Sequence, residues 1–456
     1  MKNTIAIILA AGKGTRMKSD LPKVLHKVCG KTMIDHVIDN CKNSSIENTY
    51  TIVGYKHEEI IEIIKENSKY ILQERQLGTG HALKQASEVL KSNFQSKVLV
   101  LMGDAPLISC ETIEKLLKKH ENNYNNATVL TSIIKNPLGY GRIVKDNEGN
   151  LIKIVEQKDA NELQLQINEI NSGMYCFDAD HLYRALEKLT NNNAQGEYYL
   201  TDVIEIMKNS DLKVGVVETI EEDIKAVNSR VELSQVERIL QKRINDKLME
   251  NGVTIIDPSN TYINDSVFIG QDTIIYPGAI IEGNTKIGTK CTIGHNSRIR
   301  ECVIGDNVEI QSSTLQESII NKDTSIGPYA YIRPNCIIGE RVKIGDYVEV
   351  KNSVIGNDTK ASHLTYIGDA EVGNRVNLGC GVVFVNYNGK KKQKTIVEDD
   401  CFIGCNVNLI APVSVKKGAY IAAGSTITNN VDEENLAIAR CKQVNKVDYA
   451  KKLMRD

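Results

Sequence analysis

The sequence predicts a Rossmann-like α/β domain followed by a parallel β-helix, and two observations carry this prediction. In the N-terminal half, short apolar segments alternate with helical segments, which is typical of a parallel sheet covered by helices. From Ile269 onward an aliphatic residue returns every sixth position, a period that suits neither a helix nor a hairpin. The chain of 456 residues is also too long for a single hydrophobic core.

The composition limits the classes of protein to consider. Hydrophobic residues make up 41% and charged residues 25%, as in ordinary soluble proteins, and a net charge of -2 gives no reason to expect a nucleic acid or membrane partner. The eleven cysteines form no CxxC pairs, which indicates neither a zinc site nor a disulfide framework. The apolar run at residues 5–11 is too short to span a membrane and lacks the flanks of a signal peptide. We therefore expect a cytoplasmic protein.

Residues 5–10 predict a buried parallel strand that leads directly into a glycine-rich loop at residues 11–17. Two glycines let the backbone approach a ligand closely, while consecutive N–H groups, Lys13 and Arg16 supply positive potential. These features suit a phosphate chain. The loop is neither a Walker loop nor a complete dinucleotide fingerprint, and a plain structural turn explains the glycines equally well.

Further strands are predicted at residues 50–53, 98–102 and 127–134. In such a sheet, ligands bind at the carboxyl ends of the strands. Asp104 follows one of these ends, where a carboxylate suits Mg²⁺ on phosphates, although it also suits a helix cap.

A helix is predicted between the two halves of the chain. Ser229 and Glu232 have the spacing of a capping box, and Gly252 ends the helical pattern. About 23 residues give a rod of roughly 35 Å. We divide the chain into an α/β domain at residues 1–230, a linker helix at 231–251 and a β-helix domain at 252–456. The apolar residues of the helix are Val236, Ile239, Leu240, Ile244 and Leu248.

The aliphatic ladder predicts triangular coils of about 18 residues, each with three short strands and one inward side chain per strand. Glycine and asparagine suit the corners, where the backbone needs positive φ. The ladder consists of Ile269, Ile275, Ile281, Ile287, Ile293, Ile299 and, after a slip of one residue, Ile304, Ile310, Ile320, Ile326, Ile332, Ile338, Ile344 and Val350.

Arg333 and Lys351 are one coil apart, so we expect them to lie above each other. Two cations about 5 Å apart repel unless an anion lies between them, which predicts a phosphate clamp; a solvated pair of surface charges is the alternative. His363 follows the clamp, although a single histidine is more often structural. The insertion at residues 386–394 either covers a ligand groove or forms a solvated tip. We expect the C-terminal tail, which carries Lys451 and Lys452, to dock on the β-helix.

Nine segments, in order, resemble sugar-nucleotide pyrophosphorylases and, with the hexapeptide repeats, the bifunctional bacterial GlmU family. This family joins an N-acetylglucosamine-1-phosphate uridyltransferase to a glucosamine-1-phosphate acetyltransferase, and the likeness covers nearly the whole chain. The segments are LAAGKGTRM at 9–17, LPKVL at 21–25, QERQLGTGHA at 73–82, GDAP at 103–106, GYGR at 139–142, VEQK at 155–158, NSG at 171–173, GEYYLTD at 196–202 and AVNS at 226–229.

For the α/β domain, the resemblance implies uridyl transfer from UTP to N-acetylglucosamine-1-phosphate with Mg²⁺. Arg16 and Lys23 would assist by charge, without a covalent nucleophile, although Lys23 alone would be read as a surface lysine. Asp104 and Asn228 would hold the metal. Gln73 would read the uracil, and Gly141, Glu156 and Asn171 would bind the sugar. The remaining UTP-binding residues would be Leu9, Ala10, Ala11, Gly12, Lys23, Gly78 and Thr79.

For the β-helix, which the family winds left-handed, the resemblance implies acetyl transfer from acetyl-CoA to glucosamine-1-phosphate. His363 would be the general base, since an imidazole can take a proton at neutral pH, and Glu349 would help to orient the site. The sugar phosphate would contact Arg333, Lys351, Tyr366 and Asn377. Acetyl-CoA would contact Cys380, Asn386, Tyr387, Cys405, Ala423 and Arg440.

This chain departs from the family pattern at three of these positions. Cysteines replace the alanine and serine expected at 380 and 405, and Asn388 replaces an aspartate. Backbone contacts survive these changes, whereas a hydroxyl contact at position 405 does not.

The resemblance also implies a homotrimer and a product, UDP-N-acetylglucosamine, that supplies peptidoglycan and lipopolysaccharide precursors. The alternative function is a pyrophosphorylase whose β-helix only oligomerises or regulates, and a scaffold with two decayed sites is a third reading. His363 together with the Arg333 and Lys351 spacing favours two sequential reactions on one chain.

Overall fold

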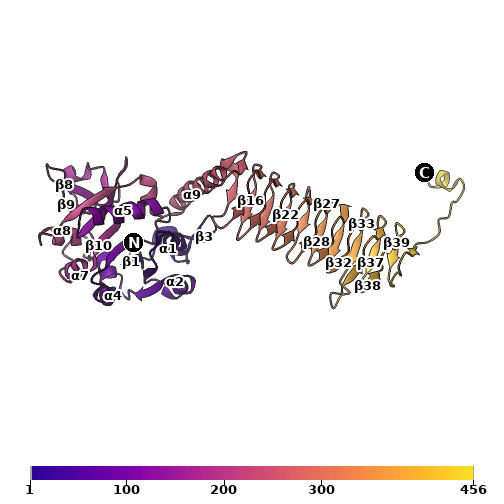
Figure 1. Ribbon diagram of the computed structural model, residues 1–456, viewed down its shortest axis with the longest axis horizontal. Coiled ribbons are helices and arrows are strands. Elements are labelled where there is room, and N and C mark those ends of the chain that lie inside the picture. The colour runs from indigo at the N-terminus through magenta and orange to yellow at the C-terminus, as the bar shows by residue number, and fades with distance from the viewer. Residues whose placement is uncertain (1–2, 455–456) are drawn as a thin grey trace. The chain divides into compact units, whose positions relative to one another are not determined.

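The computed structural model describes residues 3–454 and divides the chain into two compact units between Leu240 and Gln241. The first unit is an α/β domain and the second is built around a left-handed parallel β-helix (Figure 1). Within residues 3–454, no helix combines the length and the apolar character needed to cross a membrane.

The first unit is built on a nine-stranded sheet. Its strands are β1 (Thr4–Ala10), β4 (Asn48–Val53), β5 (Lys69–Leu72), β6 (Lys97–Met102), β7 (Ala127–Ile133), β8 (Arg142–Lys145), β9 (Leu151–Val155), β10 (Glu169–Asp178) and β11 (Val214–Glu218). The main path runs β11-β7-β10-β6-β1-β4-β5, and β8 and β9 extend from β10. Only β10 runs against its neighbours on this path. The four predicted strands are confirmed, and a separate hairpin joins β2 (Lys27–Val28) to β3 (Lys31–Thr32).

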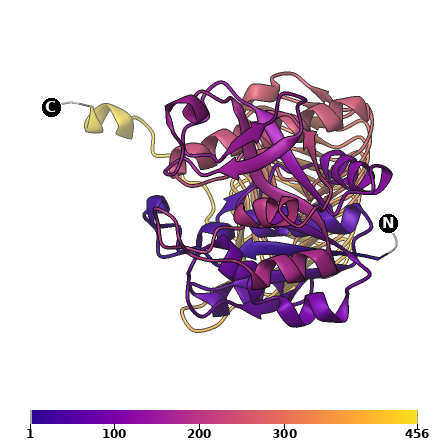
Figure 2. The ribbon, with the colours of Figure 1, turned by 90° about the vertical axis from the view of Figure 1, so that its left-hand side faces the viewer.

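Alternate side chains of the central strand β1 enter two hydrophobic cores, because successive residues of a strand point to opposite faces. Ile7 belongs to one core and Ile8 to the other. Helices cover both faces of the sheet (Figure 2). They are α1 (Met33–Asn43), α2 (His57–Ile64), α3 (Thr79–Lys84), α4 (Ser87–Ser92), α5 (Cys110–Asn122), α7 (Ala179–Glu187) and α8 (Asp202–Lys208), whereas the one-turn helix α6 (Glu162–Leu165) buries no side chain.

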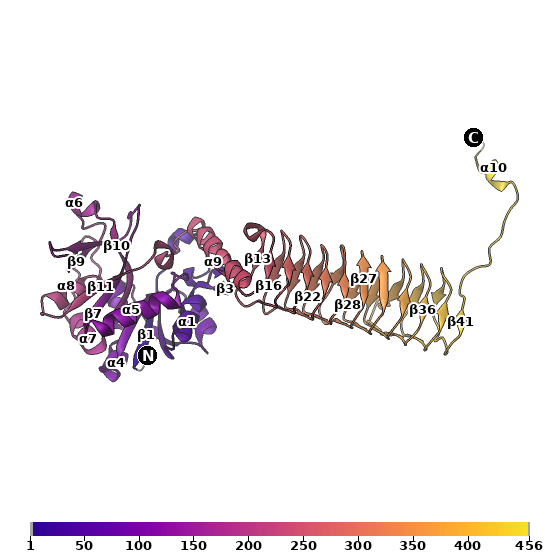
Figure 3. The same cartoon turned by 45° about the horizontal axis from the view of Figure 1, so that its top comes forward.

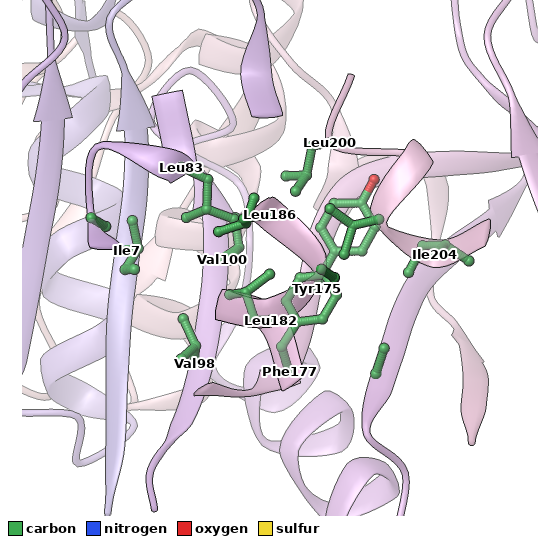
Figure 4. Close-up of a cluster of buried hydrophobic side chains, with 14 of the residues drawn as sticks. Ile7, Leu83, Val98, Val100, Tyr175, Phe177, Leu182, Leu186, Leu200 and Ile204 are labelled. Carbon is green, nitrogen blue, oxygen red and sulfur yellow. The ribbon is translucent and has the colours of Figure 1, made fainter. Parts of the chain in front are cut away.

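The core that contains Ile7 is centred on aromatic residues of β10. The rings of Tyr175 and Phe177 lie 5.3 Å apart and pack beside Leu182 and Leu186 of α7 (Figure 4). This packing fixes β10 next to β6, and the carboxyl end of β6 leads to Asp104.

The helix α9 (Arg230–Glu250) begins with the predicted cap, since the backbone N–H of Glu232 donates to Ser229 Oγ (3.2 Å). Its first half belongs to one compact unit and its second half to the other. In the second half, Asn245 is fully buried and its Nδ2 donates to the carbonyls of Pro258 (2.9 Å) and Thr261 (3.1 Å). The apolar pattern alone did not predict this polar attachment to the first coil.

Three parallel sheets form the faces of the β-helix (Figures 1 and 3). The first face contains β12 (Thr254–Ile255), β15 (Ile274–Ile275), β18 (Thr292–Ile293), β21 (Glu309–Ile310), β24 (Ser325–Ile326), β27 (Lys343–Asp346), β30 (Lys360–His363), β33 (Asn377–Leu378), β36 (Phe402–Ile403), β39 (Tyr420–Ile421) and β41 (Leu436–Ala437).

The second face contains β13 (Tyr262–Ile263), β16 (Ile280–Glu282), β19 (Arg298–Arg300), β22 (Thr314–Gln316), β25 (Tyr331–Ile332), β28 (Glu349–Lys351), β31 (Tyr366–Gly368), β34 (Val383–Val385), β37 (Asn408–Ile410) and β40 (Thr426–Ile427). The third face contains β14 (Phe268–Ile269), β17 (Lys286–Ile287), β20 (Val303–Ile304), β23 (Ile319–Ile320), β26 (Ile337–Ile338), β29 (Val354–Ile355), β32 (Ala370–Val372), β35 (Thr395–Val397) and β38 (Val413–Val415).

The predicted ladder forms the core of the β-helix, and each of its residues is at least 96% buried. Leu315 of β22 fills the step that the isoleucine pattern left open between Ile310 and Ile320. The coil length varies: Ile269 pairs with Ile287, 18 positions later, whereas Ile287 pairs with Ile304, 17 positions later. The missing residue explains the slip in the sequence ladder.

The predicted docking of the C-terminal tail, which begins at Asp432, is confirmed only for its first part: β41 (Leu436–Ala437) pairs with β39, and Arg440 donates to the Ala423 carbonyl. Residues 441–454 are exposed throughout, and the short helix α10 (Tyr449–Leu453) buries no side chain. Val444 and Val447 lie before α10, so the helix does not hold their apolar side chains on one face with its own.

Replacing the ladder residue Ile344 by alanine should lower the free energy of unfolding of the β-helix by about 2–5 kcal/mol, because the site is fully buried and leaves a cavity. The matched control is Lys343→Ala on the same strand, whose side chain points outward and whose loss should cost less than about 0.5 kcal/mol. Urea unfolding followed by circular dichroism measures both. Equal losses for the two variants would contradict the assigned inward and outward positions.

Candidate functional sites in the two units

A pocket of about 250 Å³ opens at the carboxyl ends of β1 and β6. Strand order alone explains its position, because β1 and β6 are parallel neighbours and both end at this edge of the sheet. The structure brings nine of the predicted residues to its walls: Leu9, Ala10, Ala11, Gly12, Lys23, Gln73, Gly78, Thr79 and Asp104. Sequence reasoning missed Val24, Gln76, Ala82, Met102 and Glu197, which also line it.

The glycine-rich loop holds Lys23 against the pocket. Gly14 has a positive φ of 62°, and a Cβ at this position would lie 2.6 Å from Lys23 Cβ. A side chain at position 14 would therefore displace the lysine. This close contact explains why position 14 is a glycine, which the pattern of the loop alone does not explain.

Four predicted polar residues meet at one end of this pocket. Lys23 Nζ forms an ion pair with Asp104 Oδ2 and also donates to Asn228 Oδ1 (3.1 Å). Arg16 Nη2 donates to the same Asn228 oxygen (2.9 Å). Glu232, which sequence reasoning assigned only to the helix cap, accepts from the Asn228 backbone N–H (2.6 Å) and so orients Asn228.

The donor set around Lys23 fits a hard cation. The Lys23 ammonium lies between carboxylate and amide oxygens, and Asp104 Oδ1 is buried with no hydrogen-bond partner among residues 3–454. In the same part of the chain, His, Cys, Asp and Glu form no group of three with metal spacing. A cation at Asp104 and Asn228 would need further oxygens from phosphate and water, which is the usual coordination of Mg²⁺.

The three predicted sugar-binding residues form one row across three strands. Arg142 pairs with Val155 and with Ile170, which places Gly141 between Glu156 and Asn171. The Asn171 N–H donates to the Gly141 carbonyl (2.9 Å). A Cβ on Gly141 would lie 3.2 Å from Ile154 and 3.6 Å from a Glu156 carboxylate oxygen, so only glycine leaves this row open. Burial raises the pKa of Glu156, although Thr201 donates a hydrogen bond to it.

In the β-helix, Arg333 and Lys351 occupy equivalent positions on successive coils, as predicted, because Ile332 pairs with Val350. Each cation has a carboxylate partner: Arg333 pairs with Glu349 (2.8 Å) and Lys351 with Asp369 (3.6 Å). Glu349 therefore balances the charge of Arg333, and the structure does not place it beside His363 as an orienting group.

A third cation, Lys392, lies beside Lys351. The proximity of the two ammonium groups lowers the pKa of Lys392. The insertion brings Lys392 there through Asn386, whose amide donates to Asp369 and lies 3.4 Å from the Tyr366 hydroxyl. No period in the sequence could have identified Lys392, because it lies on an insertion outside the repeat.

His363 is exposed at the end of β30, and its Nδ1–H donates to Asp346 Oδ1 (2.6 Å). Asp346 and His363 are paired residues of neighbouring coils. The hydrogen bond from His363 holds the pKa of Asp346 below its ordinary value, so the carboxylate stays ionised at neutral pH. The sequence did not predict Asp346, because the expected coil has 18 residues whereas Asp346 and His363 are 17 residues apart.

Cys380, Cys405 and Ala423 lie on successive coils at the corner between the first and second faces. Backbone hydrogen bonds join the coils at this corner: the Asn406 N–H donates to the Cys380 carbonyl and the Gly424 N–H to the Cys405 carbonyl (both 2.8 Å). Arg440 Nη1 donates to the Ala423 carbonyl (2.9 Å). Both cysteines are exposed.

The insertion carries the remaining acetyl-CoA candidates. Tyr387 is exposed and its hydroxyl donates to the Gly389 carbonyl (2.8 Å). Asn388 Oδ1 accepts from the N–H groups of Lys390 and Lys391 (3.1 and 3.0 Å), which an aspartate oxygen could also do.

Within one chain, the acetyl-transfer candidates fall on two edges of the second face. His363, Cys380, Cys405 and Ala423 lie at its edge with the first face, whereas Arg333, Lys351 and Asn386 lie at its edge with the third face. A strand of three residues, β31, separates the edges by about 10 Å. Asn377 belongs to β33 on the first face and is not grouped with Lys351 and Tyr366.

Known families match both units of the chain. A nucleotidyl transferase model matches residues 5–237, and a bacterial transferase hexapeptide model of six repeats matches residues 394–429. A model of the GMPPB C-terminal domain matches residues 263–355 and 314–388. A solved putative glucose-1-phosphate thymidylyltransferase from Bacillus anthracis aligns with a TM-score of 0.43 and 20% identity, over 52% of this chain and 94% of that chain.

Curated relatives match over almost the full length. The Bifunctional protein GlmU of Clostridium novyi (strain NT) is 56% identical over 96% of both chains. That of Clostridium botulinum (strain 657 / Type Ba4) is 55% identical over 98% of both, and that of Clostridioides difficile (strain 630) is 54% identical over 99% of this chain and 98% of its own. The chain therefore belongs to the GlmU family of bifunctional proteins.

Proposed function

We propose that the chain makes UDP-N-acetylglucosamine in two steps, acetyl transfer in the β-helix and uridyl transfer in the α/β domain. One observation carries this proposal: each unit holds its own constellation, the Lys23, Asp104 and Asn228 cluster in one and the His363–Asp346 pair in the other. UTP and acetyl-CoA are intracellular metabolites, from which we infer a cytoplasmic location. The alternative, a pyrophosphorylase with a purely structural β-helix, leaves the His363–Asp346 pair without a role.

The test measures the two half-reactions separately on the purified protein. Acetyl-CoA with glucosamine-1-phosphate should release the coenzyme thiol, and UTP with N-acetylglucosamine-1-phosphate should release pyrophosphate. Pyrophosphate release without thiol release would favour the pyrophosphorylase alternative, and the absence of both would favour a scaffold.

In uridyl transfer, a phosphate oxygen of N-acetylglucosamine-1-phosphate attacks the α-phosphorus of UTP, and pyrophosphate leaves. The sugar row of Gly141, Glu156 and Asn171 positions the attacking molecule. Lys23 and Arg16 neutralise the charge that builds up on the phosphates, so the site needs no covalent nucleophile. Mg²⁺ held by Asp104 and Asn228 would supply further neutralisation of the triphosphate.

In acetyl transfer, the amine of glucosamine-1-phosphate attacks the thioester carbon of acetyl-CoA, and the coenzyme thiolate leaves. His363 Nε2 takes the proton from the amine, because the hydrogen bond to Asp346 keeps the other ring proton on Nδ1. Arg333, Lys351 and Lys392 supply the positive charge for the sugar phosphate.

Within one chain, the substrate would have to reach both edges of the second face. Its amine and phosphate are attached at neighbouring ring carbons, whereas His363 and Lys351 lie on edges about 10 Å apart. A homotrimer, the assembly implied by the family resemblance, would bring the His363 edge of one chain to the Lys351 edge of another. An exposed apolar stripe on the third face, formed by Val303, Ile319, Ile337 and Val354, also supports self-association.

Mixed assemblies should therefore recover acetyl transfer. His363→Ala and Lys351→Ala should each be inactive alone, but their co-expression should restore about one quarter of the wild-type rate, since half of the chains supply each intact edge. Thiol release and the molar mass of the assembly are measured together. A mixture as inactive as its components would mean that each chain completes its own site.

A further inference from the structure

Arg142 is among the most deeply buried charged residues of the chain, with 2% of its surface exposed. Among residues 3–454 it has no carboxylate within ion-pair distance, and its two hydrogen bonds go to neutral oxygens. Burying a guanidinium without a counter-charge is costly, because a guanidinium stays protonated and loses its hydration. The burial of Arg142 therefore needs an explanation other than an ion pair.

The guanidinium makes two hydrogen bonds, and both lead to the sugar row. Nη1 donates to the Tyr140 carbonyl, directly before Gly141. Nη2 donates to Gln157 Oε1 (2.8 Å), directly after Glu156, and the same Gln157 oxygen accepts from the Gly139 N–H (3.2 Å). Arg142 thus joins the loop before β8 to the end of β9.

The Tyr140 side chain extends this connection toward the phosphate end of the site. The ring packs against the core that contains Ile8. Burial, together with the carboxylates of Glu232, Glu221 and Asp104, raises the pKa of the Tyr140 phenol. A shift of the Tyr140 backbone would move Gly141 relative to both Glu156 and Asp104.

We propose that Arg142 is a positioning residue that sets the spacing of the Gly141, Glu156 and Asn171 row and thereby the affinity for the sugar phosphate. The inference rests on the proposed uridyl transfer. Arg142 touches no UTP-pocket residue in its hydrogen bonds, so its loss should weaken binding of the sugar phosphate and leave UTP binding almost unchanged.

The test compares two variants. Arg142→Gln removes the charge and the side chain that bonds both Tyr140 and Gln157, whereas Gln157→Ala keeps the arginine and removes one of its acceptors. We expect the KM for N-acetylglucosamine-1-phosphate to rise about tenfold in Arg142→Gln and several-fold in Gln157→Ala, with the KM for UTP within about twofold of wild type. The double variant should resemble Arg142→Gln alone, since both changes break one connection. Arg184→Gln, at an exposed arginine of the same unit, is the control and should change neither KM.

Acetyl transfer on the same chain reports whether each variant is intact, and circular dichroism reports its fold. Equal increases in both KM values, or a fall in kcat alone, would overturn the positioning role. If Arg142→Gln fails to fold, an unchanged sugar-phosphate KM in Gln157→Ala overturns the proposal by itself. A wild-type protein without pyrophosphate release would instead refute the proposed uridyl transfer, so the two failures are distinguishable.

Discussion

His363→Ala should lower the rate of acetyl transfer about 10²- to 10⁴-fold and leave uridyl transfer at the wild-type rate. The variant removes the group that, in the proposed mechanism, takes the proton from the attacking amine. The imidazole is exposed, so its loss leaves no cavity and should not alter the fold. Thiol release measures the first reaction and pyrophosphate release the second, in the same preparation.

Asp346→Asn is the control that separates the base from the residue that orients it. An asparagine can still contact His363 but does not favour the tautomer with the proton on Nδ1, so acetyl transfer should fall to a level between wild type and His363→Ala. Because hydrogen bonding lowers the pKa of Asp346, the carboxylate protonates only in acid, and Asp346 should cause no loss of activity between pH 7 and pH 9. Near-normal acetyl transfer in His363→Ala would refute the assignment of the base.

Asp104→Ala should lower uridyl transfer by about 10²- to 10³-fold, the typical loss when one electrostatic contact to the transition state is removed. The variant deletes the carboxylate that meets Lys23 and that would hold Mg²⁺ with Asn228. The magnesium concentration for half-maximal activity should rise, while acetyl transfer should not change. Pyrophosphate release across a magnesium titration measures the effect.

Asp223→Ala is the wrong control for this experiment, because the Asp223 carboxylate accepts buried hydrogen bonds from Ser109 and Thr112 and its loss would disturb the fold. Asp180→Ala is a better one, since its partner Arg184 is exposed on the surface of the same unit. A rate in Asp104→Ala equal to that of Asp180→Ala would show that the cluster around Lys23 has another purpose.

The sequence predicts the fold well wherever one local rule decides the residue type. From Ile269 to Val350 the inward residue of each strand is aliphatic, so this ladder is readable without a structure. The strand ending at Ala10 is equally readable, because a strand buried on both faces is apolar throughout.

Contacts between distant segments could be predicted only in part. The meeting of Gly12 and Asp104 follows from two neighbouring strands that end at one edge. Lys23 lies well beyond β1, and Glu232 accepts a hydrogen bond from Asn228 although its spacing in the sequence predicts only a helix cap. Asp346 could not be predicted as the partner of His363, because one coil is a residue shorter than the ideal repeat. Lys392 could not be predicted beside Lys351, because it lies on an insertion. Such positions depend on small variations in coil length and loop shape, which a periodic pattern does not encode.

The order of the two reactions provides the most direct test of two cooperating sites on one chain. Wild-type protein is supplied with UTP, Mg²⁺ and glucosamine-1-phosphate, and pyrophosphate release is recorded before and after acetyl-CoA is added. The sugar row should accept the acetylated product far better than the free amine, so pyrophosphate should appear mainly after acetyl-CoA is added and should follow thiol release. Rapid pyrophosphate release before acetyl-CoA is added, or no thiol release after it, would contradict this account.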